Sequence, residues 1–108
     1  MAKGIFYVES RPTGPDRDLE YNTWYNEVHI PELLALDGFV AARRLRPVQD
    51  DGPYVSIYEL EGDDLEAIIA NMIAAAGRGE FRLSDAMQMD PPPSYRLLEL
   101  TTERVAVA

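Results

Sequence analysis

The sequence contains no cysteine and only one histidine, His29. The absence of cysteine excludes disulfide bonds, thiolate nucleophiles, iron–sulfur clusters and zinc sites that need sulfur. One histidine cannot supply a centre with two or three histidine ligands, although a carboxylate-rich site for a hard cation would still be possible. We therefore expect no metal site and no cofactor.

Basic residues are also few. Ten Lys and Arg against nineteen Asp and Glu give the chain a formal net charge of −9. A surface of this charge repels the phosphate groups of nucleic acids and of anionic membranes. No apolar run approaches the roughly 20 residues that span a bilayer, and the N-terminus lacks the pattern of a signal peptide. We expect neither nucleic acid nor membrane as a partner, and a cytoplasmic location.

Several common catalytic motifs are missing. The sequence has no nucleotide-binding glycine loop, no serine elbow and no Walker sequence, which argues against phosphoryl transfer, dinucleotide chemistry and serine hydrolysis. Histidine, tyrosine, arginine and carboxylate side chains remain. These groups suit proton transfer next to a carbonyl, ring closure, dehydration or isomerisation of a small, largely apolar molecule.

The length of 108 residues, with 46% hydrophobic residues, predicts one globular domain over 1–108. A chain of this size buries only roughly 60 to 70% of its unfolded surface, and the remaining apolar surface favours a partner. We therefore expect the protein to form oligomers.

Hydrophobic periodicity predicts the element order βαββαβ. Strands are expected at 3–9, 39–48, 54–60 and 94–101, and helices from residue 16 or 18 to 36 and from an N-cap at 63–64 to 77. Pro31 lies inside the first helix and predicts that the helix bends or is split just after His29. The order matches the ferredoxin-like α+β fold, a four-stranded antiparallel sheet with two helices on one face.

The third predicted strand alternates strictly in side-chain type. If Val55 and Ile57 pack on the helices, the opposite face of the sheet stays open. The open face then carries Tyr54, Ser56 and Tyr58, together with Tyr7 and Glu9. Two semi-polar aromatic faces of this kind would cover each other in a homodimer.

His29 is the best candidate for a general acid or base, because only its side chain has an ordinary pKa near neutrality. The alternative is a structural role, in which His29 caps the carbonyls freed by Pro31. Tyr25 lies one helical turn before His29, and the hydroxyls of Tyr25 and Tyr58 could polarise a carbonyl. Trp24 serves either as core packing or as a stacking platform for a ligand.

Three arginines, Arg43, Arg44 and Arg46, lie on the second predicted strand. Because side chains alternate along a strand, Arg43 points to the face opposite the other two. One of these sets approaches a covered surface, where it needs a carboxylate or an anionic substrate as partner. Cross-strand ion pairing within the sheet is the alternative.

Residues 24–34 (WYNEVHIPELL), followed by Asp37-Gly38-Phe39 and an arginine-bearing strand, resemble the EthD-like branch of the dimeric α+β-barrel superfamily. Asp37 stands where the family usually has proline, while Gly38 and Phe39 keep the turn and the packing residue. The predicted element order extends the resemblance to nearly the whole chain.

The resemblance implies a homodimer in which two sheets close into a barrel, with a pocket between sheet and helices in each protomer. Together with the available groups, it favours a cofactor-independent acid/base enzyme of the cyclase, isomerase or dehydratase type. Its ligand would be a small hydrophobic aromatic or polyketide-like carbonyl compound. The alternatives are a non-catalytic small-ligand-binding or accessory protein and a cofactor-free monooxygenase of the same superfamily. The expected catalytic residues are His29, Tyr25 and Tyr58, and the expected substrate contacts are Trp24, Tyr7, Tyr54, Arg43 and Phe39.

Overall fold

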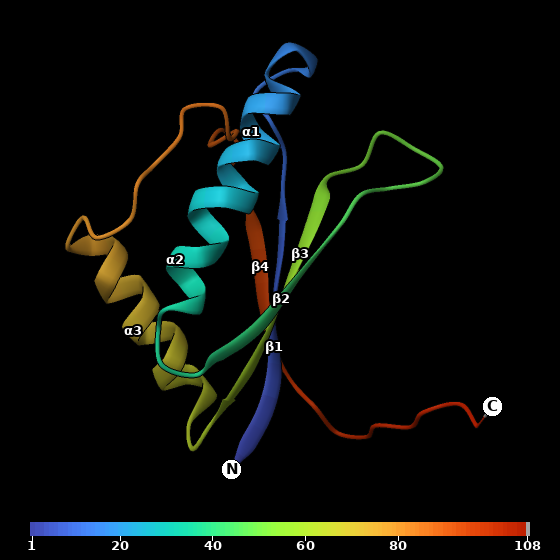
Figure 1. The fold of residues 1–108 in the computed structure, drawn as a ribbon, viewed down its shortest axis with the longest axis vertical. Coiled ribbons are helices and arrows are strands. Elements are labelled where there is room, and N and C mark those ends of the chain that lie inside the picture. The colour runs from blue at the N-terminus through green and yellow to red at the C-terminus, as the bar shows by residue number, and fades with distance from the viewer. Residues whose placement is uncertain (108) are drawn as a thin grey trace.

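The computed structural model describes residues 1–107 and has a four-stranded antiparallel sheet in the order β2-β3-β1-β4. The helices lie together on one face of this sheet (Figure 1). The predicted ferredoxin-like α+β fold is confirmed. The strands are β1 (Ala2–Ser10), β2 (Phe39–Leu45), β3 (Tyr54–Gly62) and β4 (Ser94–Glu99), and the second long helix is α3 (Leu65–Gly77).

The first helix is a continuous run with several geometries. It consists of the 3-10 turn η1 (Pro15–Arg17), α1 (Asp18–Trp24), the π-helical η2 (Tyr25–His29) and α2 (Ile30–Leu34). The expected division just after His29 is present, because the π-helical segment ends at His29 and α2 begins at Ile30. Pro31 stands in the first turn of α2, where a missing N–H is tolerated. No helix within residues 1–107 is long and apolar enough to cross a membrane.

The two faces of the sheet are the reverse of the expected ones. In β3 the alternate side chains Ser56, Tyr58 and Leu60 are buried, while Val55 and Ile57 are only partly buried. The side chains of Tyr54, Ser56 and Tyr58 therefore face the helices, and those of Val55 and Ile57 are open. Tyrosine rings fill the larger space under a helix, and their hydroxyls find partners there.

The open face of the sheet carries apolar side chains between charged ones. The register places Tyr7 of β1 opposite Ile57 of β3, and both are partly exposed. Arg43 pairs with Glu59 on this face, with 2.6 Å between Nη1 and Oε1. Tyr7 and Glu9 thus lie on the open face as expected. Their neighbours on this face are Val55 and Ile57 and not the expected Tyr54 and Tyr58.

The core lies between the sheet and the helices and is rich in aromatic residues. Its buried side chains include Phe6, Tyr21, Tyr25, Leu33, Phe39, Tyr58, Leu60 and Ile69. Asp64 begins α3 as expected, because its carboxylate accepts a hydrogen bond from the Ala67 amide at 3.2 Å.

Gly38 sits where the chain leaves the first helix and enters β2 beneath α3. Its φ is +89°, in the left-handed region, and a Cβ atom at this position would lie 2.5 Å from Cδ1 of Ile68. Only glycine can adopt this φ without strain and avoid displacing the Ile68 side chain. The turn that sets the packing of β2 against α3 therefore depends on this residue.

Replacement of this glycine should separate backbone strain from helix propensity. We expect Gly38→Ala to lower the free energy of unfolding by more than about 1 kcal/mol in urea denaturation. Gly77→Ala is the matched control, because Gly77 ends α3 with open space around it and no positive φ. That change should raise stability by about 0.5 to 1 kcal/mol. Equal effects of the two substitutions would contradict the role given to Gly38.

Candidate functional site

Three tyrosines form the centre of the candidate site. Tyr21, Tyr25 and Tyr58 are 0%, 1% and 0% exposed, respectively. The Tyr58 hydroxyl donates to the Tyr25 hydroxyl at 3.4 Å, and the Tyr21 and Ser10 hydroxyls lie 2.6 Å apart. These side chains fill the space between the first helix and the sheet, where a pocket was expected.

His29 lies within an aromatic shell at the end of η2. Its ring stacks on Trp24 with centroids 4.9 Å apart and stands edge-on to Tyr25 at 5.0 Å. The π-helical segment explains the stack, because five residues complete about one turn there and bring Trp24 and His29 to the same side. The Nδ1 atom is buried and has no hydrogen-bond partner within residues 1–107. Capping of a freed carbonyl through this atom is therefore not observed.

The environment of His29 keeps its ring neutral. Burial lowers the pKa of His29 to about 4, the negative charge of Glu32 opposes this shift, and the positive charge of Arg44 adds to it. At neutral pH the imidazole therefore has a free lone pair that can accept a proton. Burial, and next the neighbouring Tyr25, raise the pKa of Tyr58, so its hydroxyl keeps its proton and acts as a hydrogen-bond donor.

Arg44 completes the site from the sheet side. Its guanidinium carbon lies 4.1 Å from the Tyr25 ring centroid, and the rings of Tyr21 and Tyr54 are 5.3 and 5.2 Å away. Nη1 donates to the side-chain oxygens of Asn22 and Asn26 at 2.8 and 3.1 Å. Arg44 is thus the arginine that contacts the covered surface, although Arg43 was the expected substrate contact.

A β-bulge explains which arginine turns inward. Phe39 faces the helices opposite Leu60, and regular alternation from Phe39 would bring Arg43 to the same face. The register shifts between Phe39 and Ala41, after which Ala42 and Arg44 take the inner positions. A bulge of one residue reverses every side chain that follows it.

The expected site residues fall into two groups. His29, Tyr25 and Tyr58 come together as the tyrosine and histidine cluster described above. Trp24 donates through Nε1 to the Arg82 carbonyl at 2.9 Å, and Phe39 packs on Tyr58 with centroids 5.8 Å apart. Tyr7 and Arg43 lie on the open face, away from this cluster.

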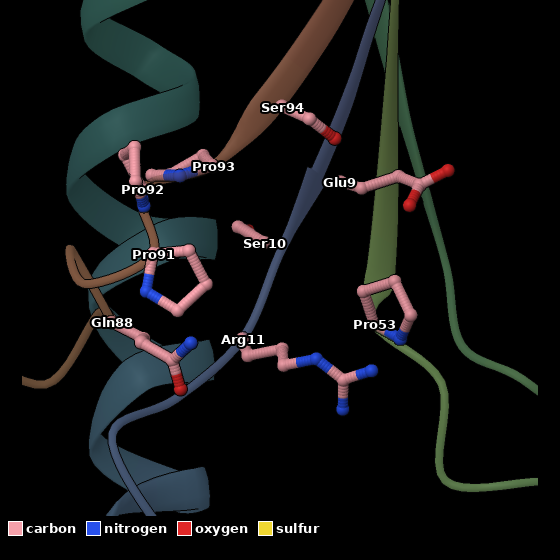
Figure 2. Close-up of a pocket in the computed structure, with 9 residues that line it drawn as sticks. All are labelled: Glu9, Ser10, Arg11, Pro53, Gln88, Pro91, Pro92, Pro93 and Ser94. Atoms are coloured by element: carbon pink, nitrogen blue, oxygen red, sulfur yellow. The ribbon is translucent and has the colours of Figure 1, made fainter.

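Open clefts lie at the end of the molecule where β1 leaves the sheet. Figure 2 shows one of them, with Arg11 and Pro53 on one side and Gln88 and Pro91 on the other. Its volume is about 190 Å³. Arg11 reaches across and donates to the Asp51 carbonyl at 2.7 Å. A larger cleft, with a volume of about 410 Å³, is lined by Arg44 and its partners Asn22 and Asn26. Within residues 1–107, no group of three or more His, Cys, Asp or Glu side chains is arranged to hold a metal ion.

Comparison with known proteins gives no match: no family model fits the chain, and no curated protein or solved structure is significantly similar to it. Fold and geometry define the chain as a ferredoxin-like α+β domain with a buried tyrosine and histidine cluster. Its chemistry must be argued from these residues.

The pKa of the single histidine can be measured directly. We expect the His29 ring to titrate near pH 4 by NMR and to stay neutral between pH 5 and 8. The unfolded chain binds this proton near pH 6.5. The contribution of the neutral His29 to the free energy of unfolding should therefore be fully present above pH 6.5 and should be lost as the pH falls toward 4. Urea denaturation of His29→Gln should lack this dependence between pH 5 and 6.5. A ring that titrates near 6.5 in the folded protein would disprove the buried, neutral state.

Proposed function

We propose that the protein is a cofactor-independent acid/base enzyme acting on a small aromatic or polyketide-like carbonyl compound. The observation that supports this most is the buried, unpartnered Nδ1 of a neutral His29 next to the hydroxyl pair of Tyr25 and Tyr58. The resemblance to the EthD-like family supports the same assignment. Reactions of the cyclase, isomerase or dehydratase type all begin with a proton transfer of this kind.

In this proposal His29 removes a proton from the carbon next to the carbonyl. The electron pair of that C–H bond moves onto the carbonyl oxygen, and the resulting enolate accepts a hydrogen bond from a tyrosine hydroxyl. The guanidinium of Arg44 lies 4.1 Å from the Tyr25 ring, and its positive charge stabilises the negative charge of the enolate. Return of the proton from His29 to another atom of the substrate completes an isomerisation. In a ring closure, the enolate carbon attacks a second carbonyl of the substrate, and the alkoxide formed there takes the proton back from His29.

The Nδ1 atom of His29 is buried although the residue is partly exposed, so access of a ligand to this atom requires movement of the neighbouring segment. Phe81 stands edge-on to the His29 ring at 6.4 Å. Two hydrogen bonds hold the backbone of the adjoining Arg82. The Trp24 indole donates to its carbonyl, and its amide donates to the Glu32 carboxylate at 3.0 Å. We propose that the ligand enters when these two hydrogen bonds open.

We also propose that two copies of the chain pair through their open sheet faces. Partly exposed apolar side chains such as Val55 and Ile57 lie at the centre of this face, and the Arg43–Glu59 pair lies beside them. Burial of these apolar groups favours association, and a small core makes the gain important. The EthD-like resemblance implies the same dimer.

Proton exchange provides a test of the acid/base activity without knowledge of the natural substrate. In D₂O at pH 7, the protein should accelerate exchange of the methyl protons of acetophenone, followed by NMR. His29→Gln should reduce this acceleration at least about 100-fold, since a positioned base contributes 10² or more. Tyr58→Phe should reduce it less, and Tyr95→Phe, at an exposed tyrosine of β4, should leave it unchanged. Equal rates for the wild type and His29→Gln would remove His29 from the mechanism, and ligand binding without exchange would favour the binding-protein alternative.

The dimer can be tested by sedimentation equilibrium at micromolar concentration. The wild type should have twice the chain mass of 12.1 kDa. Ile57→Glu places a charge at the centre of the open face and should shift the protein to the monomer. Ile73→Glu is the matched control, because Ile73 is 54% exposed on α3, away from the sheet. A monomeric wild type would refute the proposed dimer.

A further inference from the structure

We propose that the cleft beside Arg44 is a binding site for a carboxylate group carried by a small aromatic molecule. The cleft has a volume of about 410 Å³ and lies between the first helix and the end of edge strand β2. Pockets of a few hundred Å³ hold small ligands. Its lining residues are Asp18, Asn22, Asn26, Arg44, Leu45, Arg46 and Tyr54.

Arg44 has hydrogen-bond donors to spare. A guanidinium carries five N–H donors. Nη1 uses both of its hydrogens on Asn22 and Asn26, and Nη2 uses one on the Tyr21 hydroxyl at 3.3 Å. The buried Nε has no partner within residues 1–107, so Nε–H and one Nη2–H are left. Because burial shields Nε–H from the cleft, a ligand carboxylate would be bound through the remaining Nη2–H and through Nη1, whose contact with Asn26 is solvent-exposed.

Arg44 also lacks a counter-charge. Within residues 1–107, the ion pairs involve other arginines and Lys3, and no carboxylate pairs with Arg44. The one acidic group in the cleft, Asp18, accepts the Tyr54 hydroxyl at 2.6 Å instead. The polar partners of Arg44 are neutral asparagines and a tyrosine, although the chain has a net charge of −9 and many carboxylates. A partly buried cation without its own anion gains from one brought by a ligand.

The geometry favours a small monoanion with an apolar body. Two cations, Arg44 and Arg46, and one carboxylate, Asp18, line the cleft, which leaves room for one further negative charge. The Tyr54 ring and Leu45 offer apolar surface for an aromatic group. The Arg44 contact with Asn26 is solvent-exposed, so a ligand oxygen can replace the amide oxygen there.

This inference deepens the proposed function and rests on it only in one respect, namely that the carboxylate belongs to the substrate. The Tyr25 ring lies between the two groups, 4.1 Å from the Arg44 guanidinium and 5.0 Å from the His29 ring. A carboxylate bound at Arg44 would therefore lie one aromatic ring away from His29. Binding of a carboxylate is measurable without turnover, so either proposal can fail alone.

The test is titration of the protein with benzoate and with benzamide, its neutral isostere, followed by NMR chemical shifts at 50 mM salt. We expect benzoate to bind at least tenfold more tightly than benzamide. Arg44→Gln should weaken benzoate binding at least tenfold, and Arg78→Gln, at an arginine paired with Glu80 after the end of α3, should leave it unchanged. The shifts caused by benzoate should centre on Asn22 and Asn26.

A second variant keeps the test decisive if Arg44→Gln fails to fold. Asn26→Asp places a carboxylate at the atom that already lies 3.1 Å from Arg44 Nη1. It should keep or raise the melting temperature, because it supplies a counter-charge, and still weaken benzoate binding at least tenfold. Equal binding of benzoate and benzamide, or full benzoate binding by a folded Asn26→Asp, would overturn the carboxylate site. If the wild type binds benzoate but does not accelerate the proton exchange of acetophenone, the proposed function is contradicted and the carboxylate site is not.

Discussion

The contact between the Arg44 guanidinium and the Tyr25 ring joins the edge of the sheet to the first helix, and the arrangement of the candidate site depends on it. Tyr25 and Arg44 are 19 residues apart in the sequence, and their contact joins η2 to β2. A cation against an aromatic face is stabilised by the ring quadrupole, and more so when water is excluded. This one contact sets which side chains surround the cation and how near it lies to His29.

Local geometry within the first helix determines the other half of the site. A regular α-helix would separate Trp24 and His29 around the helix axis, whereas the π-helical segment stacks their rings. The same segment ends immediately before α2, where Pro31 requires no amide donor. Segments of this type often lie at functional sites. The neutral state of His29 follows from the aromatic shell that this geometry builds.

The order of strands and helices could be predicted from the sequence, because periods of two and of 3.6 residues are local properties of the chain. The faces of the sheet could not, since the alternation in β3 shows which residues share a face but not which face is covered. The inward arginine depends on a bulge after Phe39, which no composition or spacing marked. His29 and Tyr25 lie together as expected, whereas Tyr58 meets them from the sheet face that was expected to be open, and Phe81 comes from a segment without periodicity.

The candidate site depends most on a guanidinium held against tyrosine rings, with its Nε–H buried and without a partner within residues 1–107. NMR of the arginine Nε–H groups tests this directly, with the Arg44 resonance assigned by its loss in Arg44→Lys. Because the Arg44 guanidinium carbon lies 4.1 Å from the Tyr25 centroid, ring currents should move this resonance upfield of the other arginines. Burial should also slow its exchange with water. An Arg44 Nε–H with the shift and rapid exchange of an exposed arginine would contradict the account.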